Sequence, residues 1–187
     1  KFLYEKIEKY DQHTIKEYAY QIYESSHNSY KLLQNLLEWS RAQMGRLEFK
    51  PVLFNLYDLT DEAVASLYSQ AKSKNIHFDI NVDFNYNLQA DRNMVATILR
   101  NLISNAIKYS YQEGQIQIGA RKNEHHIKIW VHDFGQGIPE TTRKKLFKIS
   151  EKVTTPGTEK EKGTGLGLLL VKEFAEKHKG TISIESE

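Results

Sequence analysis

Three segments rich in asparagine or glycine follow one another along the chain, and their order constrains the fold more than any other feature. The first, at 101–108, reads NLISNAIK; the second, at 133–138, reads DFGQGI; the third, at 163–168, reads GTGLGL. Glycine lets a backbone approach a ligand closely because it has no Cβ atom, and a helix start offers amide groups to phosphate. Together the segments predict a nucleotide site that holds a metal-bound triphosphate against one helix.

The composition fits a single core with a helical extension. The chain has 187 residues, of which 40% are apolar and 27% charged, the balance of a globular protein. A formal net charge of +2 argues against nucleic acid as a partner. The chain has no cysteine, which excludes disulfides and cysteine metal sites and fits a cytoplasmic location. No apolar run approaches the roughly 18 residues of a membrane span. We therefore expect no membrane contact by this segment, while the full-length protein can be anchored elsewhere.

An amphipathic helix is expected in the first part of the chain. Thr14 and Glu17 form a capping-box pair, and Gly45 supplies a stop. Between them a heptad stripe, typical of a helix packed lengthwise on a partner, contains Ile15, Ala19, Ile22, Ser26, Ser29, Leu33, Leu36 and Ser40. At 1.5 Å per residue this helix would be about 46 Å long and the piece before its turn about 14 Å. We expect an antiparallel hairpin over 1–48 with a truncated first helix.

Mixed α/β patterning follows from 49 to 187. Alternating apolar and polar residues predict strands at 76–82, 115–120 and 127–131, and further strands are expected at 49–54 and 181–185. Helical spacing predicts helices at 57–74, 91–109 and 166–179. The expected fold class is therefore α+β, a sandwich of helices and sheet behind the helical hairpin.

The helix at 91–109 carries the most specific chemistry. At about 100° per residue, Asn101, Asn105 and Lys108 fall within an arc of about 60°. The neighbouring arc, expected to face the sheet, is apolar and contains Val95, Leu99, Leu102 and Ala106. Amide oxygens suit Mg²⁺, which also binds substrate phosphates, and a lysine can neutralise phosphate charge. The alternative interpretation is an ordinary solvated helix face.

The two glycine segments each have an alternative interpretation. Asp133 follows a strand and can accept a hydrogen bond from an exocyclic amine such as that of adenine, with Gly135 and Gly137 close to the ring; a plain hairpin turn is the alternative. The 163–168 segment opens a helix and suits phosphate, or it is a flexible helix entry. It matches neither the dinucleotide fingerprint nor the Walker A loop.

In this order the motifs resemble the N box and the two glycine boxes of bacterial sensor histidine kinases. The sequence at 146–148, LFK, resembles their F box, and 155–162, TPGTEKEK, resembles their ATP lid. The heptad helix with Trp39, Ser40 and Arg41 resembles the second helix of their dimerisation and phosphotransfer domain. The resemblance implies a catalytic ATP-binding domain over 49–187 of the histidine kinase, gyrase and Hsp90 type, preceded by part of that hairpin.

The resemblance also implies site residues. Asn105 would coordinate Mg²⁺ with Asn101 beside it, Lys108 would contact phosphate, and Tyr109 would lie near the nucleotide. Asp133 would bind the adenine amine. The remaining nucleotide contacts would come from the two glycine boxes: Gly135, Gly137, Ile138, Gly163, Thr164, Gly165, Leu166, Gly167 and Leu168. Lysines of the lid region could add contacts, and the cluster there comprises Lys144, Lys145, Lys148, Lys152, Lys160 and Lys162.

The implied activity is transfer of the γ-phosphoryl group of ATP to a histidine and then to an aspartate of a response-regulator receiver domain, by a homodimer formed through the hairpin. The family's acceptor motif is absent: neither His13 nor His27 has its neighbours, and the other five histidines are expected to be structural or surface residues. We expect the acceptor upstream of Lys1, so that this chain binds ATP without phosphorylating itself. Two alternatives remain: an ATPase related to gyrase, Hsp90 and MutL, and a non-catalytic nucleotide-sensing dimer.

Overall fold

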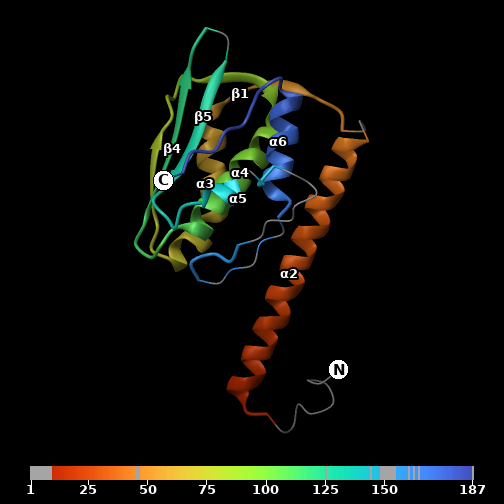
Figure 1. The fold of residues 1–187 in the computed structure, drawn as a ribbon, viewed down its shortest axis with the longest axis vertical. Coiled ribbons are helices and arrows are strands. Elements are labelled where there is room, and N and C mark those ends of the chain that lie inside the picture. Colours follow the sequence, from red (N-terminus) through yellow and green to blue (C-terminus); the bar gives the residue numbers. More distant parts are fainter. Residues whose placement is uncertain are drawn as a thin grey trace.

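The structure, a computed structural model, describes residues 10–44, 47–124, 126–143, 145–147, 155–159, 161, 163 and 165–186. One long helix leads away from a domain in which helices cover small sheets (Figure 1). The expected α+β architecture is confirmed. No helix of the described part is both long and apolar enough to cross a membrane.

The domain contains two sheets. Strands β2 (His77–Asn81), β4 (Gln115–Lys122) and β5 (Ile127–Asp133) form the larger one, in the order β2-β4-β5. Strand β2 runs parallel to β4, and β4 runs antiparallel to β5, with Ile116 opposite Asp133. Strands β1 (Pro51–Asn55) and β3 (Asn87–Asp91) form an antiparallel pair. The β4–β5 register therefore places Asp133 at the end of a strand beside the core.

Helices α3 (Leu56–Ser73) and α4 (Arg92–Tyr109) pack on each other, and α6 (Gly167–Lys177) packs beside α4. The main core joins α3 and α4 to the larger sheet, through side chains that include Leu56, Leu99, Ile103, Ile116 and Ile118. Met94, Leu170 and Phe174 form a second cluster between α4 and α6. Because α4 contributes to both clusters, its position is fixed on two sides.

The long helix α2 (Gln12–Gln43) begins earlier than the sequence suggested. Asp11 caps it: its Oδ1 accepts a hydrogen bond from the Thr14 amide at 2.7 Å. The expected capping box at Thr14 is therefore wrong by about one turn of helix. Most of the heptad stripe is exposed, with Ile22 57%, Leu33 56% and Leu36 42% accessible, whereas Ile15 and Ser40 at its two ends are half-buried. Gly45 and the first arm of the expected hairpin, at 1–9, lie outside the described residues.

Several other expectations need correction. Residues 181–186 form no strand, although they alternate as a strand would. The first strand begins at Pro51 rather than 49, and the strand β3 and the short helix α5 (Glu140–Arg143) were not expected. On α4, Leu102 is only half-buried, whereas Ile103 and Ile107 are fully buried. The buried arc of α4 is therefore turned slightly from the expected one.

Candidate nucleotide-binding site

The position of α4 is set at its amino end by Asp91. Its Oδ1 accepts hydrogen bonds from the amides of Asn93 and Met94, both at 3.1 Å, and its Oδ2 accepts one from the Lys50 amide at 2.9 Å. A carboxylate at a helix amino terminus satisfies free amides and complements the helix dipole. With its buried arc against the core, α4 presents Asn101, Asn105 and Lys108 as half-buried side chains.

Asn101 is oriented by its own helix. Its Nδ2 donates to the Thr97 carbonyl at 2.8 Å, which leaves Oδ1 as a free acceptor directed at the start of α6. A Cβ atom added to Gly167 would lie 2.6 Å from that Oδ1. The absence of a side chain at Gly167 therefore makes room for the Asn101 amide. The N box and the second glycine box meet at this point.

Asn105 lies one turn further along α4. Its half-buried amide makes no hydrogen bond with the described part of the chain. Because the described residues leave this amide unengaged, it is available to a bound ligand. The oxygens of Asn101 and Asn105 are hard donors of the kind that Mg²⁺ accepts.

Lys108 and Tyr109 contact the segment that precedes α6. The Lys108 ammonium donates to the Thr155 carbonyl at 2.9 Å and lies 3.0 Å from the Tyr109 hydroxyl. A Cβ atom on Gly163 would lie 2.8 Å from the same ammonium. The lysine expected to bind phosphate is thus beside the second glycine box, and it currently contacts a backbone carbonyl.

The first glycine box joins α4 at Tyr109. The Tyr109 carbonyl accepts a hydrogen bond from the Gln136 amide at 3.1 Å, and a Cβ atom on Gly135 would overlap that carbonyl. Asp133 Oδ1 accepts a hydrogen bond from the Gly135 amide at 3.0 Å. Burial raises the pKa of Asp133, although the Gly135 amide and His132 act in the opposite direction. Its Oδ2 makes no hydrogen bond with described residues and can accept one from a ligand.

The remaining predicted residues differ in their placement. Gly137 and Gly165 have φ of 67° and 73°, values that favour glycine. The Ile138 amide donates to Ser186 Oγ at 2.8 Å and is not free for a ligand. Leu166 precedes α6 without a side-chain cap, and Leu168 is half-buried in its first turn. The described residues do not include Thr164, nor the lysines expected to add contacts at Lys144, Lys148, Lys152, Lys160 and Lys162.

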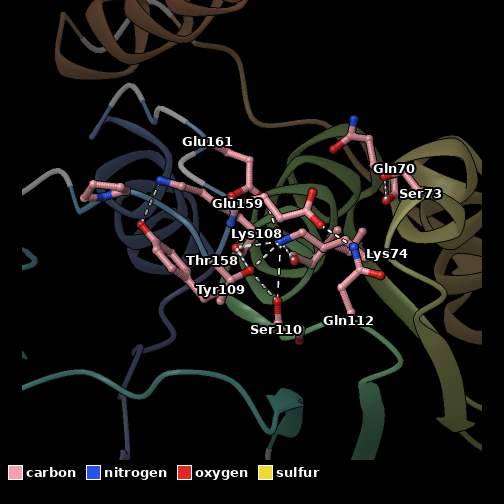
Figure 2. A network of polar contacts seen from close by, with 12 residues as sticks. Gln70, Ser73, Lys74, Lys108, Tyr109, Ser110, Gln112, Thr158, Glu159 and Glu161 are labelled. Carbon is pink, nitrogen blue, oxygen red and sulfur yellow. Dashed lines mark hydrogen bonds and ion pairs between the residues drawn. The ribbon is translucent and has the colours of Figure 1, made fainter.

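Sequence reasoning missed a polar cluster beside this site, shown in Figure 2. Lys74 is only 2% exposed, and its ammonium contacts Thr158 Oγ1 at 2.8 Å and Glu161 Oε1 at 2.5 Å. A lysine near the end of a helix is so common that nothing in the local pattern signals its burial.

Comparisons with known proteins identify the family of the chain. Residues 90–187 match the family described as histidine kinase-, DNA gyrase B-, and HSP90-like ATPase. The circadian input-output histidine kinase CikA of Synechococcus elongatus is 29% identical over 174 residues, which cover 91% of this chain and 23% of that protein. The chain thus spans about a quarter of the length of this relative.

Solved structures share the fold. Acinetobacter baumannii histidine kinase AdeS superposes with a TM-score of 0.74 at 22% identity, covering 95% of this chain and 80% of that one. Histidine kinase ThkA, solved in complex with response regulator protein TrrA, gives a TM-score of 0.70 at 24% identity, covering 91% and 47%. The chain belongs to the family of histidine kinase-, DNA gyrase B- and HSP90-like ATPases and, within it, to the sensor histidine kinases.

Proposed function

We propose that this chain binds Mg²⁺–ATP and supplies the γ-phosphoryl group for transfer to a histidine. The observation that carries the proposal is the convergence of three separate motifs on one face of α4. Asn101 faces Gly167, Lys108 faces Gly163, and the Tyr109 carbonyl faces Gly135. A Cβ atom on Gly135 would overlap the Tyr109 backbone, and one on Gly167 would collide with the Asn101 amide. At Gly163 the neighbouring atom is the movable Lys108 ammonium, at 2.8 Å from an added Cβ. These contacts support a cradle built for close backbone approach.

Each residue has a distinct proposed role. The oxygens of Asn105 and Asn101 would hold Mg²⁺, which neutralises charge on the phosphates when bound. Lys108 would exchange the Thr155 carbonyl for a phosphate oxygen, and Tyr109 would line the site beside it. Asp133 Oδ2 would accept a hydrogen bond from the adenine amine. The first amides of α6, after Gly163 and Gly165, would approach the phosphates.

Phosphoryl transfer depends mainly on positioning and on stabilising charge, which is what these residues can provide. In the intact protein, we propose, the phosphoryl group passes to a histidine and then to a response-regulator aspartate, in the cytoplasm. The complex of histidine kinase ThkA with response regulator protein TrrA supports a partner of that kind. The exposed heptad stripe of α2 supports a homodimer.

Binding of ATP to the chain, measured by calorimetry with Mg²⁺ and again with excess EDTA, tests the site. Wild type should bind tightly with Mg²⁺ and at least about tenfold more weakly without it, since a metal ion stabilises phosphate charge by several kcal/mol. Asn105→Ala should lower the affinity with Mg²⁺ to near the metal-free level. Asn93→Ala, an exposed asparagine on the same helix, is the matched control and should bind as wild type does.

The activity is tested with γ-labelled ATP, comparing this chain with the full-length protein. Label on the full-length protein that is lost in acid and kept in base would identify a phosphohistidine. Steady release of phosphate without any labelled protein would instead favour a gyrase- or Hsp90-like ATPase. Binding of ATP with neither label nor hydrolysis would favour a nucleotide-sensing module.

A further inference from the structure

Lys74 is a buried charge that the proposed roles do not use. It is the cap residue that directly follows α3, and its side chain is 3% exposed. Lysine is almost never buried to this extent unless its charge is paired, because removal of an ammonium from water is costly. The partners of this ammonium therefore indicate what the burial achieves.

One set of partners is the carboxyl end of α4. The Lys74 ammonium lies 3.0 Å from the Ile107 and Lys108 carbonyls and 3.4 Å from that of Ser110. The Ile107 and Lys108 carbonyls belong to the last turn of α4, where carbonyls have no partner within the helix and form the negative end of the helix dipole; Ser110 is the residue that follows the helix. Lys74 thus holds the backbone from which the Lys108 side chain projects.

The other set of partners belongs to the segment between 155 and 161. The Lys74 ammonium contacts Thr158 and Glu161 of this segment. Beside these contacts, the Thr158 amide donates a hydrogen bond to the Lys108 carbonyl at 3.2 Å. The segment also folds on itself, because the Gly157 amide donates to the Glu161 carbonyl at 3.0 Å. Figure 2 shows the Lys74 ammonium among Ser110, Thr158 and Glu161. The Lys74 ammonium thus joins a turn, of which residues 157–159 and 161 are described, to the end of α4.

The flanks of this turn both lie beside Lys108. Before it, the Thr155 carbonyl accepts the hydrogen bond from the Lys108 ammonium. After it, Gly163 lies so close to that ammonium that a Cβ atom would be 2.8 Å away. The turn is therefore the fixed middle of a segment whose two ends border the expected phosphate position.

We propose that Lys74 is a positioning residue of the nucleotide site, which clamps the 157–161 turn to the end of α4 and so sets where Thr155 and Gly163 lie relative to Lys108. The inference rests on the proposed function, because it assumes that Lys108 binds a phosphate. A segment ordered in advance loses less conformational entropy when the ligand binds. The clamp should therefore lengthen the time for which a nucleotide stays bound.

The test measures the dissociation rate of a fluorescent Mg²⁺–ATP analogue by stopped flow, alongside the melting temperature of each variant. Lys74→Met removes the charge at similar length. Glu161→Gln removes the ion pair and leaves only one oxygen for the Lys74 ammonium and for the Glu159 amide, which now donates to Glu161 Oε2 at 2.8 Å, while the three carbonyl acceptors of Lys74 stay in place. Both should raise the dissociation rate about tenfold with little change in association, since such effects fall mainly on dissociation. The double variant should be no faster than Lys74→Met, because both changes release one clamp.

Glu62→Gln is the matched control, because it removes the exposed ion pair of Glu62 with Arg92 at 2.6 Å and should leave dissociation unchanged. Amide exchange at Thr158 should accelerate in Lys74→Met and Glu161→Gln but not in the control. If Lys74→Met does not fold, Glu161→Gln decides the matter. Wild-type dissociation from a folded Glu161→Gln variant would overturn the inference and leave the proposed function intact. Failure of wild type to bind the analogue would overturn the proposed function itself.

Discussion

Asp133 combines a structural cost with a proposed role in binding. Its pKa is raised by burial, so the folded state binds the proton more tightly than the unfolded state does. The stability that this provides is complete below the ordinary value of 3.8 and is lost as the pH rises through the raised folded pKa. Asp133→Asn should therefore unfold at a higher temperature than wild type at pH 7, and the difference should disappear near pH 3.8.

The same substitution should weaken nucleotide binding. If the oxygen of the new side-chain amide keeps the hydrogen bond from Gly135, its NH₂ group faces the adenine amine, and two donors then oppose each other. We expect the affinity for Mg²⁺–ATP to fall about 10- to 100-fold, the cost of an unsatisfied buried hydrogen-bonding group. Calorimetry measures it, with the exposed Asp61→Asn as control. A variant that is more stable and still binds normally would remove Asp133 from the adenine site.

Gly167 tests the contact between the N box and the second glycine box. In most helical positions, a change from glycine to alanine stabilises a protein by about 0.5–1 kcal/mol. Here the new Cβ atom would lie 2.6 Å from Asn101 Oδ1, so the amide must move. We expect Gly167→Ala to lower Mg²⁺-dependent ATP affinity about tenfold, the usual effect of disturbing a ligand's orientation. Unchanged affinity in a titration with and without EDTA would show that Asn101 need not hold its present position.

At the scale of the elements, α4 depends on its cap. Asp91 is 6% exposed and accepts hydrogen bonds from two helix amides and from Lys50. Asp91→Ala should lower the free energy of unfolding by about 2 kcal/mol, at the upper end for such caps. Asn55→Ala removes the half-buried cap of α3 together with the hydrogen bond from Asn55 Nδ2 to the Phe84 carbonyl at 2.6 Å. It should cost about 1 kcal/mol, the typical loss for a cap, because Asn55 is less buried than Asp91. Urea unfolding of both variants checks this order, and equal losses would contradict it.

The helices were more predictable from the sequence than the strands. The spacing of Asn101, Asn105 and Lys108 specifies one face of a helix in any context, and the structure places all three there as half-buried side chains. Strands depend on pairing instead. Residues 181–186 alternate correctly but form no strand, whereas β3, with little alternation, forms one because it pairs with β1.

The polar contacts of the site were least predictable, because they join residues far apart in the chain. The contact of Lys74 with Glu161 spans 87 positions, the difference between their numbers, and neither residue belongs to a motif that marks it. His178 likewise accepts a hydrogen bond from the Asp91 amide at 3.1 Å, which no local pattern indicates. Motifs identify residues that bind a ligand, and only the fold shows which residues hold them in position.

Within the part of the chain that the structure describes, no helix or strand packs along most of the length of α2 (Figure 1). Its 32 residues would extend about 48 Å, and only its carboxyl-terminal part lies near the domain (Figure 1). Asn35 and Glu38, which are half-buried, lie about 150° around the helix from Leu33. The exposed stripe therefore faces away from them, where a second copy of the chain could pack against it.

Leu33→Lys places a charge in the middle of that stripe, where Leu33 is 56% exposed. If two copies pair there, the new lysine loses its hydration against apolar side chains, which is costly. The dissociation constant of the dimer should therefore rise at least about tenfold, because a buried leucine contact is also lost. Sedimentation equilibrium over a range of concentrations measures this.

Tyr20→Lys is the control. It changes a side chain that is 63% exposed and lies about 140° from the stripe, so this variant should assemble as wild type does. Nucleotide affinity should be the same in both variants, because α2 supplies no residue to the site. Equal assembly of the two variants would show that the stripe is not the interface.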